Sequence, residues 1–571
     1  MKYLLFSTKI SMKTAKSLVN SKFIFLVLIL FIVSIQLSGQ SHNEKVTIFS
    51  AFQPSLREAS KININPDPQS PVIKSGELNF SNIERVIDVK SDPPLIAFTQ
   101  VKTDEKSDKF RNYLKAALGS NLSPFFLFQH HSAFSKNMEF DLGIRHQSSW
   151  LNVKDYAPST WMKNNFTMGT HNVLGEHLWH NELVYKFDNF HYYGFKPDDF
   201  SGIPVEKDLL KQHYQRIGFK STIQSNYRDI NSLHHEVSVS YHNFSDNYKH
   251  YENQIKVDGT LKKYYEWFRF DSKQMAAVDL QANFYSRGDS LVENRSYYVK
   301  ARPYLQISGS FYEVQAGVLL TLANDSSSKF FVHPVISGKL FLFEEKVELY
   351  AQFEGENNYH SLNDLTNENP FLRPGESSWW SNTKQLFKTG IKTGVIPKLD
   401  LNIGISYAKI ENGGFYVTDT STQFRNFLTV ELDNYQQIRF LAQASYHHTD
   451  KLHSSISLTF DKNETESLEK AWHLPEFQGQ WELNYKLDDQ WSFETGLLVM
   501  GERFAPGNHS SSFKPIRLKP VTDLNFAVNY NFSKQFAVFA QLNNALNNRY
   551  ERYYNYPVQG LQLFAGMSLR F

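Results

Sequence analysis

The sequence predicts an all-β fold, a transmembrane antiparallel up-and-down β-barrel of about 22 strands, from three observations. Apolar and polar residues alternate with period two in many segments, such as Leu399, Leu401 and Ile403, which favours half-buried strands. The connections between these segments alternate between short and long. Aromatic residues make up 15% of the 571, although mean hydropathy is only −0.45. A membrane barrel reconciles these values, because only the outward half of each strand meets lipid.

The alternating segments, extended to the nearest turn signals, place the strands along the chain. Residues 521–532 are typical, because Leu524, Phe526 and Val528 occupy every second position. The expected strands are 109–119, 122–134, 138–150, 163–175, 178–194, 208–224, 233–245, 249–262, 273–286, 293–308, 311–323, 328–342, 344–360, 384–395, 399–411, 425–448, 452–463, 475–487, 492–505, 521–532, 536–546 and 561–571.

The lengths of the connections give an independent check on this strand order. Tight turns occur around 135–137 and 309–310, whereas the connections 361–383 and 412–424 are long. If residue 571 ends in the periplasm, most short turns are periplasmic and the long loops lie outside, as is typical of outer-membrane barrels. The connections that fit this rule least well are 225–232, 246–248 and 263–272.

Residues 1–40 have the three-part pattern of a secretory signal peptide. Lysines precede the apolar run from Phe23 to Val33, and small or polar residues follow it up to Gln40. The run is about 11 residues, too short for the roughly 20 that span a bilayer as a helix. An N-terminal membrane anchor is the alternative, and Met12 offers a second possible start.

Residues 41–108 form a Pro- and Ser-rich segment that we expect to lie in the periplasm or in the lumen. A segment of this length and composition cannot build a hydrophobic core of plug size. A barrel of this strand number nevertheless encloses a lumen wide enough to need a plug. We therefore expect the barrel to occupy residues 109–571 without a full plug domain.

The last strand alternates as far as the final residue. Small or polar residues separate most of its apolar positions, which are Leu563, Ala565, Met567, Leu569 and Phe571. An apolar face of this kind suits a lipid-facing strand that closes a barrel. The five residues also resemble the C-terminal signal of outer-membrane β-barrel proteins, so we interpret them as a barrel-assembly signal.

The loop before this strand resembles the final loop of TonB-dependent outer-membrane receptors. The residues that carry the resemblance are Asn543, Asn547, Tyr550, Tyr556, Pro557 and Gly560. The resemblance implies a barrel filled by a long N-terminal plug that works with TonB. The Gly-rich plug motifs of the family are absent here, so the chain resembles a plug-reduced member and leaves TonB coupling open. Residues 46–51 resemble the strand that leads into a receptor plug, or form an extended segment without that role.

Tryptophan placement favours two aromatic girdles at the membrane interfaces. Trp481 is expected in mid-strand, whereas the others fall near strand ends or in connections. The candidate girdle residues are Trp150, Trp161, Trp179, Trp267, Trp379, Trp380, Trp472 and Trp491.

Composition and motifs argue against several other classes of protein. The 60 basic and 58 acidic residues are interspersed, so we expect no nucleic-acid partner. Without cysteine there is no disulfide, cysteine-based zinc site or lipid-anchored cysteine. No nucleophile elbow, phosphate loop or dinucleotide fingerprint occurs, so we expect no enzyme, no catalytic residue and no cofactor.

The 20 histidines do not form an evident metal site. Pairs such as His130 and His131 are adjacent on expected strands, so their side chains point to opposite faces. His177 and His180, three residues apart, diverge in the same way. We therefore expect no metal site, although ligands from neighbouring strands could still meet in the lumen.

The long outer loops combine aromatic residues with amides and carboxylates, as at Asn369-Pro370-Phe371 and Tyr553 to Tyr556. Such side chains suit contact with a ligand or partner. Packing of the loops against one another, or anchoring at the interface, explains them equally well.

Two functions follow from this reading. The first is an outer-membrane receptor-like barrel that binds or transports a solute with a reduced plug, so that deleting residues 41–108 raises conductance. The second is a barrel scaffold within an outer-membrane secretion or assembly complex. A passive porin ranks only third, because leakage through an open lumen of this width counts against it. Expected partners are outer-membrane lipid, the barrel-assembly machinery and other outer-membrane proteins or a surface lipoprotein of a Gram-negative cell.

Overall fold

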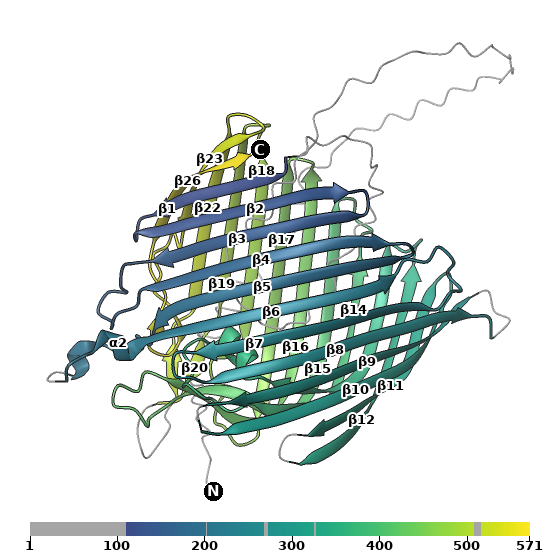
Figure 1. Cartoon of the computed structure of the whole chain (residues 1–571), viewed down its shortest axis with the longest axis horizontal. Helices are drawn as coiled ribbons and strands as arrows, with labels where there is room; N and C mark the ends of the chain where they lie inside the picture. The colour runs from purple at the N-terminus through teal and green to yellow at the C-terminus, as the bar shows by residue number, and fades with distance from the viewer. Residues whose placement is uncertain (1–109, 201–202, 268–271, 290, 325–326, 508–514) are drawn as a thin grey trace, which may run out of the picture. The chain divides into compact units, whose positions relative to one another are not determined.

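The computed structural model describes residues 110–571 except 201–202, 268–271, 290, 325–326 and 508–514. Twenty-two of its strands form one antiparallel sheet in which each strand pairs with the next along the chain. The last strand, β26, also pairs with β1, so the sheet closes into a barrel (Figure 1). The predicted barrel class is confirmed. The predicted signal peptide, residues 1–40, and the segment 41–108 lie outside the described residues.

The barrel strands are β1 Asn112–Gly119, β2 Ser123–Ser135, β3 Met138–Ser149, β4 Trp161–Leu174, β5 His177–His191, β6 Lys211–Ser225, β7 His234–Asp246, β8 Tyr251–Tyr265, β9 Lys273–Gly288, β10 Glu293–Ser308, β11 Tyr312–Asn324, β12 Ser328–Leu342, β13 Val347–His360, β14 Trp379–Thr393, β15 Leu399–Thr418, β16 Leu428–Thr449, β17 Leu452–Thr465, β18 Phe477–Lys486, β19 Trp491–Met500, β22 Val521–Asn531, β23 Phe536–Asn543 and β26 Gln562–Arg570.

The two ends of the barrel differ in the length of their connections. The end that contains the C-terminus carries the short turns, and we call it the turn end; the other is the loop end. In Figure 1 the C-terminus lies at the upper end and the label β20 at the lower end. The connections 225–232 and 263–272 lie at the turn end, and 246–248 lies at the loop end. The predicted alternation of connections between the two ends therefore holds in this region as well.

Alternating side chains explain why β26 closes the barrel. Leu563, Met567 and Leu569 are exposed on its outer face, whereas Gln562 and Phe564 are buried. Residues Phe564–Arg570 pair with Gly119–Tyr113 of β1 in continuous register. A side chain at Gly566 would meet the Ala116 carbonyl, so a glycine is needed where the first and last strands approach.

Strand β15 runs further than predicted. Asn412-Gly413-Gly414 was expected to open a long loop, because Asn and Gly favour turns. In the structure the register between β15 and β16 shifts between Ile410 and Gly413, and pairing then continues to Thr418. The glycines mark a β-bulge instead of a turn.

The loop end contains short elements that the strand pattern did not predict. They are the helices η1 Pro197–Phe200, α2 Lys207–Leu210 and α3 Leu362–Glu368, the hairpin of β20 Arg503–Ala505 with β21 Ile516–Leu518, and the pair β24 Glu551–Tyr553 with β25 Tyr556–Pro557. The expected strand 492–505 is therefore split between β19 and β20. No helix in the described ranges is long and apolar enough to cross a membrane.

Candidate functional site

We call the six residues of the last loop that resemble the receptor family the family-like loop motif, and its first half builds a tight turn after β23. Asn547, with φ of 51°, accepts a hydrogen bond from the Leu561 N–H at 3.0 Å. A Cβ on Gly560 would lie 2.2 Å from the Asn547 side-chain oxygen, so only glycine fits beside it. The buried Tyr550 donates its hydroxyl hydrogen bond to Asp523 at 2.9 Å. These motif residues shape the loop from within.

Asn544, which the motif prediction passed over in favour of Asn543, holds this turn together. Asn543 is the last residue of β23 and pairs with Gln562. Asn544 is 5% exposed, and its amide donates to the carbonyls of Asn548 and Gln559 at 2.8 and 3.2 Å. The spacing was the available signal, since Asn544 stands three residues before Asn547 and six before Tyr550.

The second half of the motif packs the last loop against other loops. Tyr556 is 2% exposed, stacks on Phe371 with ring centroids 3.8 Å apart, and donates to the Asn426 carbonyl. The Pro557 carbonyl accepts a hydrogen bond from the Tyr193 hydroxyl at 2.9 Å. Each of these contacts joins the final loop to a different loop of the barrel.

These contacts belong to a layer of folded loops at the loop end, which we call the loop layer. It comprises the described residues of the loops 192–210, 361–378, 419–427 and 544–561. Asn426 donates to the Tyr192 carbonyl at 3.1 Å, and Phe195 stacks on Phe424 at 4.4 Å. The loop 192–210 follows β5 and the loop 419–427 follows β15, which is ten steps away in a ring whose opposite walls are eleven steps apart. Loops from opposite walls therefore meet over the lumen.

The barrel wall holds α3, in the loop 361–378, at two points. Arg216 on β6 donates to Asn363 and Thr366 of α3, and to Asp188 on β5, each at 3.0 Å. Glu252 on β8 accepts hydrogen bonds from the first helical N–H groups, Leu362 at 2.9 Å and Asn363 at 3.2 Å. A carboxylate is favoured there, because the first N–H groups of a helix have no partner within it.

Apolar packing reinforces this anchoring. A buried cluster joins Leu362 of α3 to Tyr214 on β6 and Phe244 on β7. Tyr214 also donates its hydroxyl hydrogen bond to the Pro370 carbonyl at 2.9 Å, and Tyr192 donates to the Leu372 carbonyl at 3.1 Å. Buried side chains of this size each contribute about 1.5–3 kcal/mol of hydrophobic stabilisation.

The sequence contained one overlooked signal for α3. Ser361 accepts a hydrogen bond from the Asp364 N–H at 3.1 Å, and its own hydroxyl donates to the Asp364 carboxylate at 2.8 Å. A serine with an acidic residue three positions later indicates a helix start. Arg216 and Glu252 carried no comparable signal, because their role depends on a loop far away in the sequence.

The loop aromatics lie mostly in packed positions. Phe371 stacks on Tyr556, and Tyr416 meets Tyr553 edge to face at 5.4 Å. Tyr553 donates to the Glu368 carbonyl at 3.0 Å. Of the two explanations left open by the sequence, these contacts favour packing between loops over direct ligand contact.

The eight candidate girdle tryptophans occupy two different environments. Trp150, Trp267 and Trp491 are exposed, and Trp179 lies on the outward row of β5 beside the exposed Leu183. Trp472 needs correction, because it is 3% exposed and covered by protein. Trp161, Trp379 and Trp380 are partly buried and pack against buried clusters at the loop end.

The histidines pair between strands instead of along them. His131 bonds to Asp141 at 2.7 Å, Asp141 to His171 at 2.9 Å, and His171 to His180 at 2.5 Å. His130 instead contacts Asn112, as expected for a neighbour on the opposite face. Across the described ranges, no group of three or more such side chains has a geometry that could hold a metal ion.

The inner wall carries ion pairs between neighbouring strands. Arg439 on β16 makes a two-pronged contact with Asp461 on β17 at 2.7 and 3.0 Å. Lys392 on β14 pairs with Glu348 on β13 at 3.2 Å. Cross-strand pairs of opposite charge stabilise the wall modestly, and they make the lumen polar.

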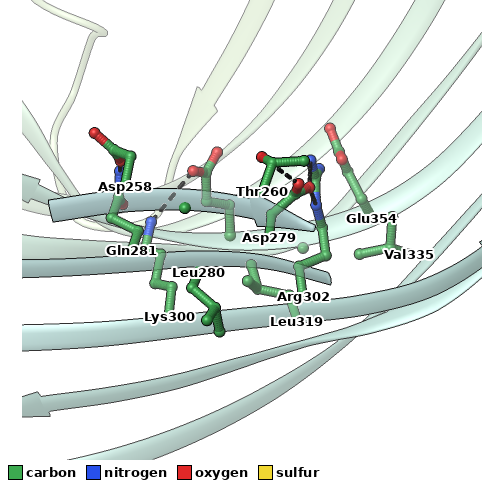
Figure 2. A pocket seen from close by; sticks show the side chains of 13 residues that line it. Asp258, Thr260, Asp279, Leu280, Gln281, Lys300, Arg302, Leu319, Val335 and Glu354 are labelled. Atoms are coloured by element: carbon green, nitrogen blue, oxygen red, sulfur yellow. Dashed lines mark hydrogen bonds and ion pairs between the residues drawn. The ribbon is translucent and has the colours of Figure 1, made fainter. Parts of the chain in front are cut away.

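An open recess of about 250 Å³ lies in this wall (Figure 2). It is lined by Asp258, Gly259, Thr260, Asp279, Leu280, Gln281, Lys300, Arg302, Leu319, Val335, Glu354, Gly355 and Glu356, which come from β8 to β13.

Most charges in the recess are paired. Asp279 accepts two hydrogen bonds from Arg302, at 3.0 and 2.5 Å, and one from Thr260 at 2.9 Å. Lys300 contacts Glu356 at 3.3 Å. Among the described residues the carboxylate of Glu354 has no such partner, and Figure 2 shows it without a dashed line. The recess can therefore offer both fixed ion pairs and one free carboxylate to a polar solute.

Burial also tunes charges within the loops. His473, in the loop between β17 and β18, has its pKa lowered to about 3 by burial and by the nearby Arg503 guanidinium. Its Nδ1 donates to the Tyr416 carbonyl at 3.0 Å, and its Nε2 accepts from the Tyr554 N–H at 3.2 Å. Burial likewise lowers the pKa of Arg503, whose guanidinium donates to the carbonyls of Glu551 and Arg552. The neutral histidine thus serves as a fixed link between loops.

Comparison with known proteins places the fold. No family model and no curated protein sequence matches the chain. Among solved structures, the siderophore receptor PirA from Acinetobacter baumannii matches with a TM-score of 0.63 at 9% identity, over 82% of this chain and 81% of that one. The ferric-catecholate import receptor Fiu from E. coli K12 matches at 0.62 and 9%, over 81% and 82%. The FrpB iron transporter from Neisseria meningitidis matches at 0.63 and 9%, over 81% and 82%. The barrel therefore has the fold of TonB-dependent outer-membrane receptors.

Proposed function

We propose that this protein is an integral outer-membrane receptor of Gram-negative cells that binds or transports a solute through its barrel with a reduced plug. The proposal rests on the fold that the chain shares with import receptors, over 81–82% of both chains, despite a sequence identity of 9%. Fold alone does not define activity. The polar inner wall and its recess supply the second support, because they give a hydrophilic solute groups to contact along the lumen.

The membrane assignment follows from the outer face of the barrel. Leu563 and Met567 on β26 are exposed together with Phe571 directly after it, and apolar residues are exposed on the neighbouring strands in the same way. A soluble protein rarely exposes so much contiguous apolar surface. We infer that this surface contacts lipid, that Trp150, Trp179, Trp267 and Trp491 lie at its margins, and that residues 1–40 direct export.

The reduced plug rests on residues 41–108. We propose that this segment, periplasmic or lumenal, serves in place of a full plug, with coupling to TonB left open. The loop layer changes how this is tested, because it bridges the loop end of the barrel. Deleting residues 41–108 is expected to raise conductance only when the loop layer has also been opened.

The test of transport is a comparison of culture media. A strain lacking the gene is complemented with the wild-type gene, with Arg302→Met, or with Lys462→Met, whose side chain is 70% exposed and paired with Glu464. We expect the wild type and Lys462→Met to deplete at least one small solute that the deletion strain leaves behind. Arg302→Met, which breaks the recess, is expected to slow that depletion.

Identical media from all four strains would argue against transport. The scaffold alternative would then gain support if the deletion strain lost another outer-membrane or surface protein. Proteomic comparison of the same outer membranes distinguishes these outcomes.

A further inference from the structure

We propose that the loop layer is a permeability barrier, which closes the loop end of the barrel even when residues 41–108 are absent. The loop 361–378, anchored by Arg216 and Glu252, is its central segment. This inference goes beyond the proposed function, because it would hold equally for a receptor or a scaffold.

The loops reach across the mouth of the barrel. A loop that merely extends from the rim contacts its neighbours along the ring. Here Tyr192, after β5, meets Phe427, before β16, with ring centroids 4.5 Å apart. Because these strands lie on nearly opposite walls, the contact crosses the mouth. Tyr556, between β23 and β26, joins the same assembly through Phe371.

The side chains that join these loops to one another and to the rim are buried. Leu372 and Leu428 are 0% and 1% exposed, and both lie in a cluster with Tyr553 and Tyr556. Leu428 begins β16 at the rim, and Leu372 of the loop 361–378 forms a β-bridge to it, so this loop is packed against the wall as closely as residues in a protein core. Residues this well packed exclude solvent from the space that they occupy.

The wall also holds α3 through two buried charged side chains. Arg216 uses its guanidinium on Asn363, Thr366 and Asp188, and Glu252 is 2% exposed against the start of α3. If α3 left the mouth, Glu252 would lose both N–H donors and Arg216 would lose two acceptors. Buried charged groups are costly without partners, so the wall favours the inserted position.

The test is conductance in planar lipid bilayers. Four proteins are compared: the full chain, a deletion of residues 41–108, that deletion with Arg216→Met and Glu252→Gln, and that deletion with 361–378 replaced by a short Gly-Ser linker. We expect the first two to show no stable open state. We expect the double substitution to raise the open fraction at least about tenfold, because it removes several buried hydrogen bonds. The linker variant is expected to form a wide, steady pore.

Matched controls separate the barrier from general damage to the wall. Arg439→Met and Glu348→Gln, in the same deletion background, break inner-wall ion pairs that do not involve α3. They are expected to stay closed. Each protein must first show a heat-modifiable, folded barrel on a gel, and the double substitution provides the answer if the linker variant does not fold.

Two results would overturn the proposal. A deletion of 41–108 that already conducts as a wide pore would show that the loop layer does not seal the mouth. A linker variant that folds and remains closed would show that 361–378 is not the central segment. Neither result depends on whether the barrel transports a solute, so each is distinct from failure of the proposed function.

Discussion

Gly194 lies directly beneath the ring of Tyr556, which links four loops. A Cβ at this position would lie 2.5 Å from a ring carbon of Tyr556, too close for any real contact. We predict that Gly194→Ala displaces this ring and destabilises the loop layer by about 1–3 kcal/mol, as overpacking does in cores. Faster cleavage by trypsin within the loops measures this effect. Gly496→Ala is the matched control, since a Cβ there meets nothing within 4 Å. Equal cleavage of both variants would contradict the prediction.

His473 makes the loop layer sensitive to acid. Its folded pKa of about 3 lies below the unfolded value of 6.5, so folding favours the neutral ring. Its contribution to stability is therefore complete above pH 6.5 and is lost as pH falls toward 3, at about 1.4 kcal/mol per unit. We predict that amide exchange in 466–476 and 551–557, corrected for intrinsic rates, accelerates as pH falls from 7 to 5.

His473→Gln is the control for this pH effect. Its amide can donate to the Tyr416 carbonyl and accept from the Tyr554 N–H, as His473 does, but it does not titrate. The variant is expected to exchange at a corrected rate that does not change between these pH values. Parallel pH profiles for the wild type and the variant would show that another group is responsible.

At the scale of the element, β26 combines pairing with an exposed apolar face. The Phe571 carbonyl accepts from the N–H groups of Arg111 and Asn112, whereas the residue as a whole is 51% exposed. Phe571→Ala keeps the backbone bonds and removes only the ring. We predict a several-fold fall in the amount of folded barrel in the outer membrane, with little change in the melting temperature of the protein that does assemble.

The comparison for this prediction is Arg570→Ala, whose guanidinium faces the Tyr113 ring on the other side of the strand. It should assemble like the wild type. If Phe571→Ala assembles normally as well, the five-residue alternation is a structural pattern and not an assembly signal.

The strands could be predicted from the sequence because their signal is local. Apolar and polar residues alternate because one side of a strand faces lipid and the other faces the lumen. This alternation predicted the bounds of β10 and β12 as they are observed. Prediction failed where a tertiary contact decides the structure. Gly413 and Gly414 favour a turn in isolation, but the Tyr435 and Trp379 rings occupy the space that side chains there would need.

The loop layer was beyond sequence reasoning for the same reason. Alternation places Arg216 and Glu252 on strands, but nothing local shows that both face α3, more than 100 residues away. Aromatic loop residues suggested contact with a partner, and the structure uses Phe371 and Tyr556 to hold loops together. The family-like motif indicated the fold correctly, although its buried amide is Asn544.

At the scale of the whole molecule, the barrel has the architecture of import receptors, and its loop end is bridged by its own loops. A sealed end suits a receptor that opens for a particular solute, and it removes the main objection to a reduced plug. The recess beneath, with its free Glu354 carboxylate, offers a place for such a solute to bind. We therefore expect this barrel to bind a small solute by itself.

Gentle extraction from native outer membranes, followed by native mass spectrometry, tests that claim most directly. We expect a single chain carrying a small non-covalent solute, with less of that solute on Arg302→Met. A chain that carries no solute and instead holds another protein in fixed stoichiometry would contradict it and favour the scaffold.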